Sequence, residues 1–169
     1  MKVRFLVPTF ALAALLAGTL ALASASQADT TKAEGQAVTI AQTNAQAISE
    51  KRRKLMKAIS GARKGLRKKA KAGSIGPAEV AQAEKIAALA KQLTGIWPKG
   101  SGSDMVKGRA KPAIWQNEAD FNKRLTKMQK AAADGAKAAK AGDAKGVSAA
   151  MKAMGCGGCH KRYRGPKPK

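Results

Sequence analysis

The chain has 169 residues, of which 33 are lysine or arginine and only 10 are aspartate or glutamate, giving a formal net charge of +23. This length suits one domain with a hydrophobic core, and nothing in the composition suggests a second domain. Such a charge attracts acidic proteins, anionic lipid surfaces or nucleic acid. The two cysteines lie three residues apart, and a loop this short argues against a disulfide-stabilised scaffold.

The N-terminal residues indicate export. Two basic residues precede an apolar run over residues 5–22, which ends in the A-x-A pattern of Ala23 and Ala25. We therefore expect residues 1–25 to be a signal peptide and the mature protein to be periplasmic. A transmembrane anchor is the alternative, but the run is barely long enough and ends at a processing site, so we expect no integral membrane span after processing. Export also makes nucleic acid an unexpected partner.

The mature chain predicts an all-α fold. Residues 26–37 are small and polar, without apolar periodicity, and are expected to form a flexible N-terminus. Apolar residues at three-, four- and seven-residue intervals then predict four amphipathic helices. The expected helices cover residues 38–72, residues 77–95, residues 117–142, and a last stretch from Asp143 into the segment 156–160. An antiparallel four-helix bundle over residues 38–164 is the simplest architecture that buries their apolar faces.

Short signals punctuate these helices. Pro77 suits the first position of the second helix, and Asn117 suits the N-cap of the third. Residues 98–112, rich in glycine, serine and lysine, predict a loop. The tail over residues 165–169 contains two prolines and cannot continue a helix.

The first predicted helix is strongly basic, because residues 49–71 contain eleven lysines or arginines against one glutamate. One interpretation is a solvated face whose long side chains surround a buried seam. The other is a docking surface for an acidic redox partner protein. Such a cationic helix would resist pairing with its own copy, which weakens any expectation of a homodimer without excluding one.

The motif Cys156-Gly157-Gly158-Cys159-His160 is C-x-x-C-H, the attachment signature of c-type haem. Two thiols add across the vinyl groups of the porphyrin, and the adjacent imidazole reaches the iron. Both cysteines and the only histidine of the chain stand in this motif. The sequence therefore predicts one covalently bound haem c per chain near the C-terminal helix, with His160 as an axial ligand. The two glycines are expected to let the backbone approach the ring.

Three other chemistries use paired cysteines. A thioredoxin-like dithiol needs a strand-helix-strand context, which this sequence lacks. A structural zinc site needs a fourth ligand, and the chain has no further histidine or cysteine. A simple exposed disulfide explains the cysteines but leaves His160 without a role. Haem attachment accounts for all three residues.

The iron face opposite His160 is either open or capped, and a methionine thioether is the usual cap in cytochromes c. No sulfur-containing residue follows His160. Four methionines are less suited by position: Met105 in the predicted loop, Met128 on the third helix, and Met151 and Met154 on the helix of His160. Met56 is a flexible candidate on the core side of the first helix, although a core methionine is more often packing than ligand.

The late C-x-x-C-H motif followed by Tyr163-Arg164, the four-helix pattern, and the segments 53–59 and 112–115 resemble the class II c-type cytochromes, the cytochrome c-prime family. The resemblance spans about residues 44–164. It implies a left-handed four-helix bundle that holds haem between its helices. It also implies thioether attachment at Cys156 and Cys159, His160 as the proximal ligand and Met56 at the distal position.

The resemblance extends to arginines. Arg52 and Arg53 lie about one turn from Met56, where the family often has an arginine near a haem propionate; ordinary surface charge is the alternative. Arg164 follows His160 by four residues and is placed either to modulate the proximal side or to stabilise the helix dipole. Trp97 and Trp115, in contrast, are expected to anchor the bundle and its loop.

The function expected from these features is that of a periplasmic monohaem one-electron carrier with His160 and Met56 on the iron. The alternative is a five-coordinate protein that binds nitric oxide or carbon monoxide at an open distal site, since family members with methionine at this position occur in both kinds. No nucleophile, general base or pair of substrate carboxylates can be assigned, so the chain is not expected to be an enzyme. A cationic surface or nucleic-acid-binding protein lacks support, because no aromatic residues interleave with the basic ones.

Overall fold

The computed structural model describes residues 25–168, and the predicted signal peptide lies outside them apart from Ala25. The helices are α1 (Ala25–Lys71), α2 (Pro77–Lys91), α3 (Ala113–Gln116), α4 (Glu118–Lys140), α5 (Ala144–Ala153) and α6 (Cys156–Tyr163). No strand occurs among these residues, which confirms the all-α expectation. A search of the same residues finds no helix with the length and apolarity needed to span a bilayer.

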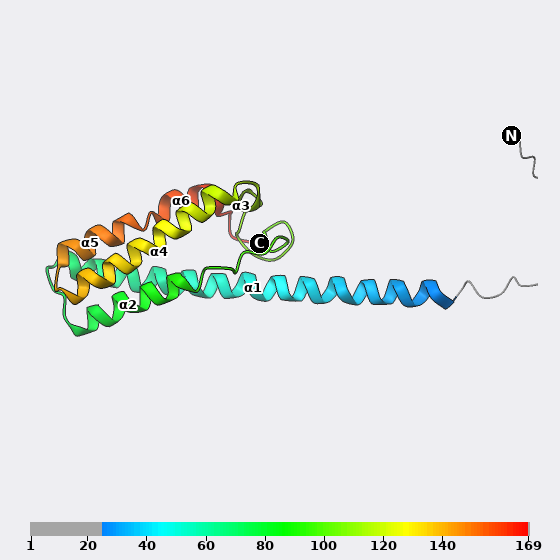
Figure 1. Cartoon of the computed structure of the whole chain (residues 1–169), viewed down its shortest axis with the longest axis horizontal. Helices are drawn as coiled ribbons and strands as arrows, with labels where there is room; N and C mark the ends of the chain where they lie inside the picture. The colour runs from blue at the N-terminus through cyan, green and yellow to red at the C-terminus, as the bar shows by residue number, and fades with distance from the viewer. Residues whose placement is uncertain (1–24, 169) are drawn as a thin grey trace, which may run out of the picture. The chain divides into compact units, whose positions relative to one another are not determined.

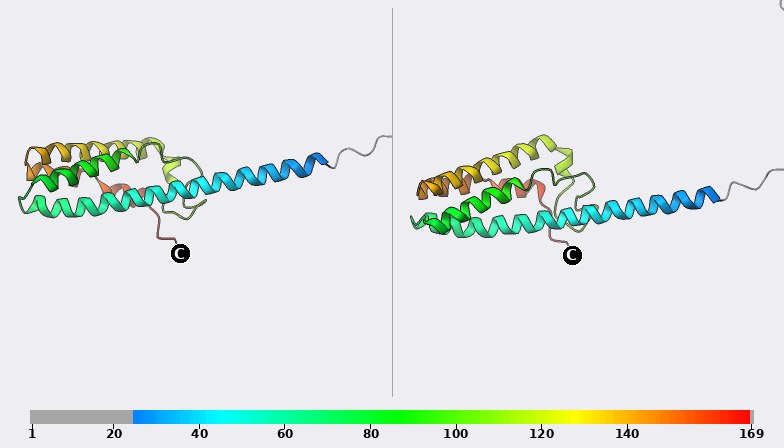
Figure 2. Two further views of the ribbon diagram at one scale, coloured as in Figure 1. Left: turned by 90° about the horizontal axis from the view of Figure 1, so that it is seen from below. Right: turned by 60° about the horizontal axis from the view of Figure 1, so that its bottom comes forward.

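The chain divides into two units, residues 1–37 and residues 38–169. In the second unit, α1 from residue 38 onward, α2, α4 and the consecutive pair α5 and α6 run side by side as a four-helix bundle (Figures 1 and 2). Helix α4 packs against α2, α5 and α6. The predicted bundle is therefore confirmed.

Helix α1 begins at Ala25, before the predicted start at residue 38. Residues 26–37, expected to be flexible, are helical in the structure. Alanine and glutamine are common in this segment and both favour helices, and no proline interrupts it. Extending an existing helix costs far less than nucleating a new one, so a segment without an apolar stripe can still be helical.

The predicted last helix is two helices, so the expectation of one continuous element was wrong. Gly155 has φ 63°, in the left-handed region, and separates α5 from α6. The start of α5 agrees with the prediction, because the Asp143 carboxylate accepts a hydrogen bond of 2.8 Å from the Gly146 backbone N–H. The bend redirects the C-x-x-C-H segment relative to α5.

The short helix α3 was not predicted, and Asn117 acts differently from the expected cap. Asn117 occupies the N-cap of α4, but its side chain accepts no capping hydrogen bond. Its Nδ2 instead donates to the carbonyl of Ala113, at 3.3 Å, at the start of α3. The asparagine therefore fixes the corner between α3 and α4.

The loop before α3 holds the end of α6. Ala110 and Arg164 form an isolated antiparallel bridge, and the Lys111 N–H donates to the Tyr163 carbonyl at 3.0 Å. The Gly165 N–H donates to the Arg109 carbonyl at 2.7 Å. These contacts fix the C-terminal end of α6 to a segment more than fifty residues earlier in the chain.

The buried apolar residues form two clusters. The larger joins the inner faces of α1, α2, α4 and α5, and its fully buried members include Leu66, Ile86, Leu93, Val147 and Met151. The smaller consists of Ile114, Phe121 and Tyr163, one residue each from α3, α4 and α6. The smaller cluster therefore places α6 against the rest of the bundle.

Candidate functional site

A cavity of about 360 Å³ lies beside the C-x-x-C-H segment. Its walls come from α1, the segment after α2, α4 and α6. The lining residues are Met56, Ile59, Ser60, Arg63, Trp97, Phe121, Arg124, Leu125, Lys127, Met128, Met154, Gly155, Cys156, Gly158, Cys159, His160 and Arg164. A volume of this order is typical of small-molecule and cofactor sites.

Both cysteines lie in the cavity wall and both are half-buried. They stand at the first and fourth positions of α6, so their side chains share one face of the helix. Burial raises the pKa of the Cys159 thiol, and the nearby Arg124 only partly opposes this. No strand flanks α6 among the described residues, so the strand-helix-strand context of a thioredoxin-like pair is absent there.

His160 lies in the same wall. Burial lowers the pKa of its imidazole, and the positive charges of Arg164 and Arg109 lower it further. A neutral imidazole has a nitrogen lone pair, which is the form that binds metals. Among the described residues, no cluster of three or more histidine, cysteine or acidic side chains could hold a metal ion, so a zinc site gains no support there.

Met56 reaches the cavity from α1, whereas His160 reaches it from α6. Its side chain is half-buried and packs against the larger core cluster. Met128 and Met154 also line the cavity, whereas Met151 does not. Met105 is 56% exposed and lies away from the cavity. The structure thus brings His160 and Met56 together, with two other methionines in the same wall.

Of the three arginines predicted near the haem, the structure places one in the cavity wall. Arg164 lines the cavity, but Arg52 and Arg53 do not. Arg53 is exposed, while Arg52 is buried and donates to the Ser101 hydroxyl at 2.9 Å, to the Ser101 carbonyl and to the Ile96 carbonyl at 3.4 Å. Burial lowers the pKa of Arg52 to about 10. In this structure Arg52 fixes the segment after α2, and a propionate contact stays a prediction.

Sequence reasoning missed three other cations in the cavity wall: Arg63, Arg124 and Lys127. Together with Arg164 they make four, and no carboxylate lines the cavity. With so many lysines and arginines in the chain, only the fold could single these out. Two cysteines, an imidazole, apolar walls and basic side chains fit a haem, which is a flat apolar ring with two carboxylates.

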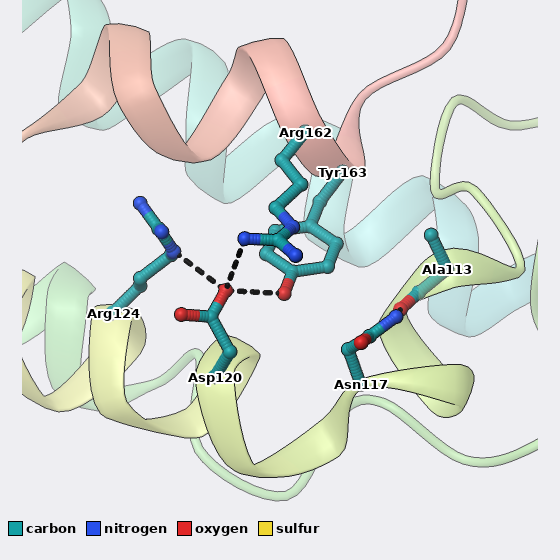
Figure 3. A network of polar contacts seen from close by, with 6 residues as sticks. All are labelled: Ala113, Asn117, Asp120, Arg124, Arg162 and Tyr163. Carbon is teal, nitrogen blue, oxygen red and sulfur yellow. Dashed lines mark hydrogen bonds and ion pairs between the residues drawn. The ribbon is translucent and has the colours of Figure 1, made fainter.

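A network around Asp120 ties α6 to α4 (Figure 3). Its Oδ2 accepts hydrogen bonds from Arg124 Nε at 2.8 Å and Tyr163 Oη at 2.5 Å, and Arg162 Nη1 lies 3.6 Å away. The bonds from Arg124 and Tyr163 lower the pKa of Asp120 to about 2. One carboxylate therefore fixes the end of α6 and orients an arginine of the cavity wall.

Aromatic rings complete this wall. Trp97 and Phe121 meet edge to face with centroids 4.8 Å apart, and Phe121 and Tyr163 do so at 5.3 Å. The Trp97 indole N–H donates to the Leu93 carbonyl at 2.7 Å, and that of Trp115 donates to the Trp97 carbonyl at 3.0 Å. Both tryptophans are thus the anchors that the sequence predicted.

Comparison with known proteins identifies the family. The family model described as Cytochrome C' matches residues 46–164. A cytochrome c-556 of Agrobacterium tumefaciens (strain II Chrys) is 37% identical over 119 residues, covering 68% of this chain and 94% of that protein. A solved cytochrome c' from Rhodobacter Spheriodes superposes with a TM-score of 0.62 at 29% identity, covering 73% of this chain and 98% of that chain.

A second solved cytochrome c' is described as having an unusual ligand-controlled dimer dissociation. It has a TM-score of 0.63 at 27% identity and covers 72% of this chain and 97% of that chain. The two cysteines and the imidazole beside an apolar cavity agree with what these matches indicate. The chain therefore belongs to the cytochrome c' family, the class II c-type cytochromes, and carries covalently bound haem c.

Proposed function

We propose that this protein is a periplasmic one-electron carrier whose haem is attached at Cys156 and Cys159 and whose iron is ligated by His160 and Met56. The observation that carries the proposal is that His160 on α6 and Met56 on α1 line one cavity. The bound haem would supply the reversible change between ferric and ferrous iron. The protein itself needs no catalytic residue, and we propose none.

The chain's own residues would bury and orient the ring. The apolar side chains of Ile59, Phe121 and Leu125 line the cavity and would exclude water from it. Burial keeps the His160 imidazole neutral, because it lowers the pKa of that group. Arg124 and Arg164 lie in the same wall and carry charges that suit the haem carboxylates. Export to the periplasm is proposed from the N-terminal pattern alone.

A gas-binding protein with an open distal site is the second candidate. One relative, described as having an unusual ligand-controlled dimer dissociation, supports this candidate. In this chain the same function would require Met56 to pack beside the iron without binding it. Such a protein would bind carbon monoxide readily in the ferrous state. If it formed a homodimer, ligand binding could control the dissociation of that dimer.

Replacing Met56 separates the two functions. We expect the ferric wild type to show low-spin bands and a sulfur-to-iron charge-transfer band, and both should vanish in Met56→Ala. Met128→Leu and Met154→Leu are the matched controls, since both residues line the same cavity. Met105→Ala controls for the loss of an exposed methionine.

Two results would contradict the proposal. Broad high-spin bands in the wild type that Met56→Ala leaves unchanged would mean an open site and would make gas binding the first candidate. Loss of the charge-transfer band in Met128→Leu or Met154→Leu, with Met56→Ala unaffected, would keep electron transfer but assign the ligand to another helix.

A further inference from the structure

Basic side chains line the cavity. Arg63, Arg124, Lys127 and Arg164, here called the cationic mouth, line it without any acidic residue. Lys127 and Arg164 are exposed, and the other two are half-buried. Within the described part of the chain neither Lys127 nor Arg164 has an ion pair.

This charge exceeds what one haem can neutralise. A haem brings two carboxylates, whereas the cationic mouth has four positive side chains. Asp120 is the carboxylate that bonds Arg124, and it also pairs with Arg162, which adds a further cation beside it. At least two positive charges therefore remain to attract a negatively charged surface at the opening of the cavity.

The backbone beside the attachment cysteines is uncovered. Gly157 is exposed and does not line the cavity, and a Cβ at this position would meet no atom within 4 Å. Its φ is not in the left-handed region. A large surface could therefore approach α6 closely at the point nearest to the thioether attachments.

From these observations we infer that the cationic mouth, with Gly157 at its edge, is the docking surface for an acidic redox protein. The inference deepens the proposed electron-carrier function and rests on it. The contact then lies around the cavity, on residues of α1, α4 and α6, and not on the whole basic face of α1, which was one of two interpretations of the sequence. Electrostatic complementarity of this kind acts mainly on the rate of association.

The test measures electron transfer from an acidic flavodoxin in its hydroquinone form to the ferric holoprotein. The donor flavin loses one electron and becomes the semiquinone, and the ferric haem becomes ferrous. Lys127→Glu should lower the second-order rate roughly fivefold at an ionic strength of about 0.01 M, where the Debye length is about 30 Å. The difference should disappear near 1 M salt, where that length is about 3 Å.

Lys145→Glu is the matched control, because it makes the same charge change on an exposed lysine. Lys145 lies at the start of α5, at the end of the bundle opposite to α6 (Figure 1). Gly157→Glu should slow the reaction as Lys127→Glu does. Optical spectra and reduction potentials of every variant report on an intact haem site.

Equal effects of Lys127→Glu and Lys145→Glu would overturn the inference, since only net charge would then matter. Lys127→Glu with an unchanged rate would also overturn it. A third outcome would also overturn the inference: Lys127→Glu, but not Lys145→Glu, abolishes binding to phosphatidylserine vesicles and leaves the flavodoxin kinetics unchanged. The surface would then bind lipid headgroups. These experiments do not measure the charge-transfer band that tests Met56 ligation. The docking surface and the proposed function can therefore fail independently of each other.

Discussion

Two helical glycines should respond to alanine in opposite directions. Gly61 lies in α1 and Gly135 in α4, and neither has a positive φ. A Cβ at Gly61 would meet no atom within 4 Å. Gly61→Ala should therefore stabilise the protein by about 0.5 to 1 kcal/mol, the gain in helix propensity.

The Cβ of Gly135→Ala meets a full core. It would lie 2.6 Å from Met151 Cε and 3.3 Å from Ala150 Cβ, both on the facing helix α5. Met151 Cε is the end of a flexible side chain, but Met151 is completely buried, so the methyl group must move within a packed core. Overpacking costs about 1 to 3 kcal/mol, which exceeds the propensity gain of about 1 kcal/mol. We expect a net loss of about 1 kcal/mol.

Thermal unfolding of the holoprotein checks both signs. Gly61→Ala should raise the melting temperature and Gly135→Ala should lower it, each by about 3 °C. In a Met151→Ala background the 2.6 Å contact is gone and only the 3.3 Å contact with Ala150 Cβ remains, so the loss caused by Gly135→Ala should shrink there. If Gly135→Ala stabilises the wild type as much as Gly61→Ala does, the packing argument is wrong.

Three further perturbations test the surroundings of the site. The pKa of Asp120 is about 2 in the folded state, so its ionised form stabilises the protein fully above about pH 4, and this stabilisation is lost as the pH falls through 2. Tyr163→Phe removes one of the hydrogen bonds that lower this pKa. The loss of unfolding free energy in Tyr163→Phe, measured by urea unfolding, should therefore become smaller between pH 4 and pH 2. Gly155→Ala forces a side chain to φ 63° and should destabilise the holoprotein by about 1 to 2 kcal/mol in urea unfolding. Arg52→Ala leaves the buried Ser101 carbonyl and the partly buried Ile96 carbonyl without their donor and should cost about 2 kcal/mol, whereas the exposed Arg53→Ala should change the melting temperature little.

The sequence predicted the parts of the fold whose signals are local. Apolar residues such as Leu55, Ile59 and Leu66 recur at helical spacing, and the structure buries all three. The C-x-x-C-H motif is informative because its residues are adjacent in sequence and use both cysteines and the only histidine. Met56 could be chosen because its place on the apolar stripe of α1 is also local information.

The remaining features depend on tertiary contacts. A glycine at position 155 is compatible with a continuous helix, and only the packing of α6 requires the left-handed turn. Arg52 sits among exposed lysines in the sequence, yet the segment after α2 folds over it and buries it. The cations at positions 63, 124 and 127 become neighbours of one cavity only when α1 and α4 pack together.

The position of His160 follows from these same contacts. Helix α6 has eight residues, two of them glycines, and is too short to be stable alone. Its place beside the cavity is therefore set from outside, by Phe121 and Ile114 packing on Tyr163, by the hydrogen bond from Tyr163 to Asp120, and by the backbone bridge at Arg164. Since no other element carries the imidazole, the distance from His160 to a ligand on α1 depends on these other side chains.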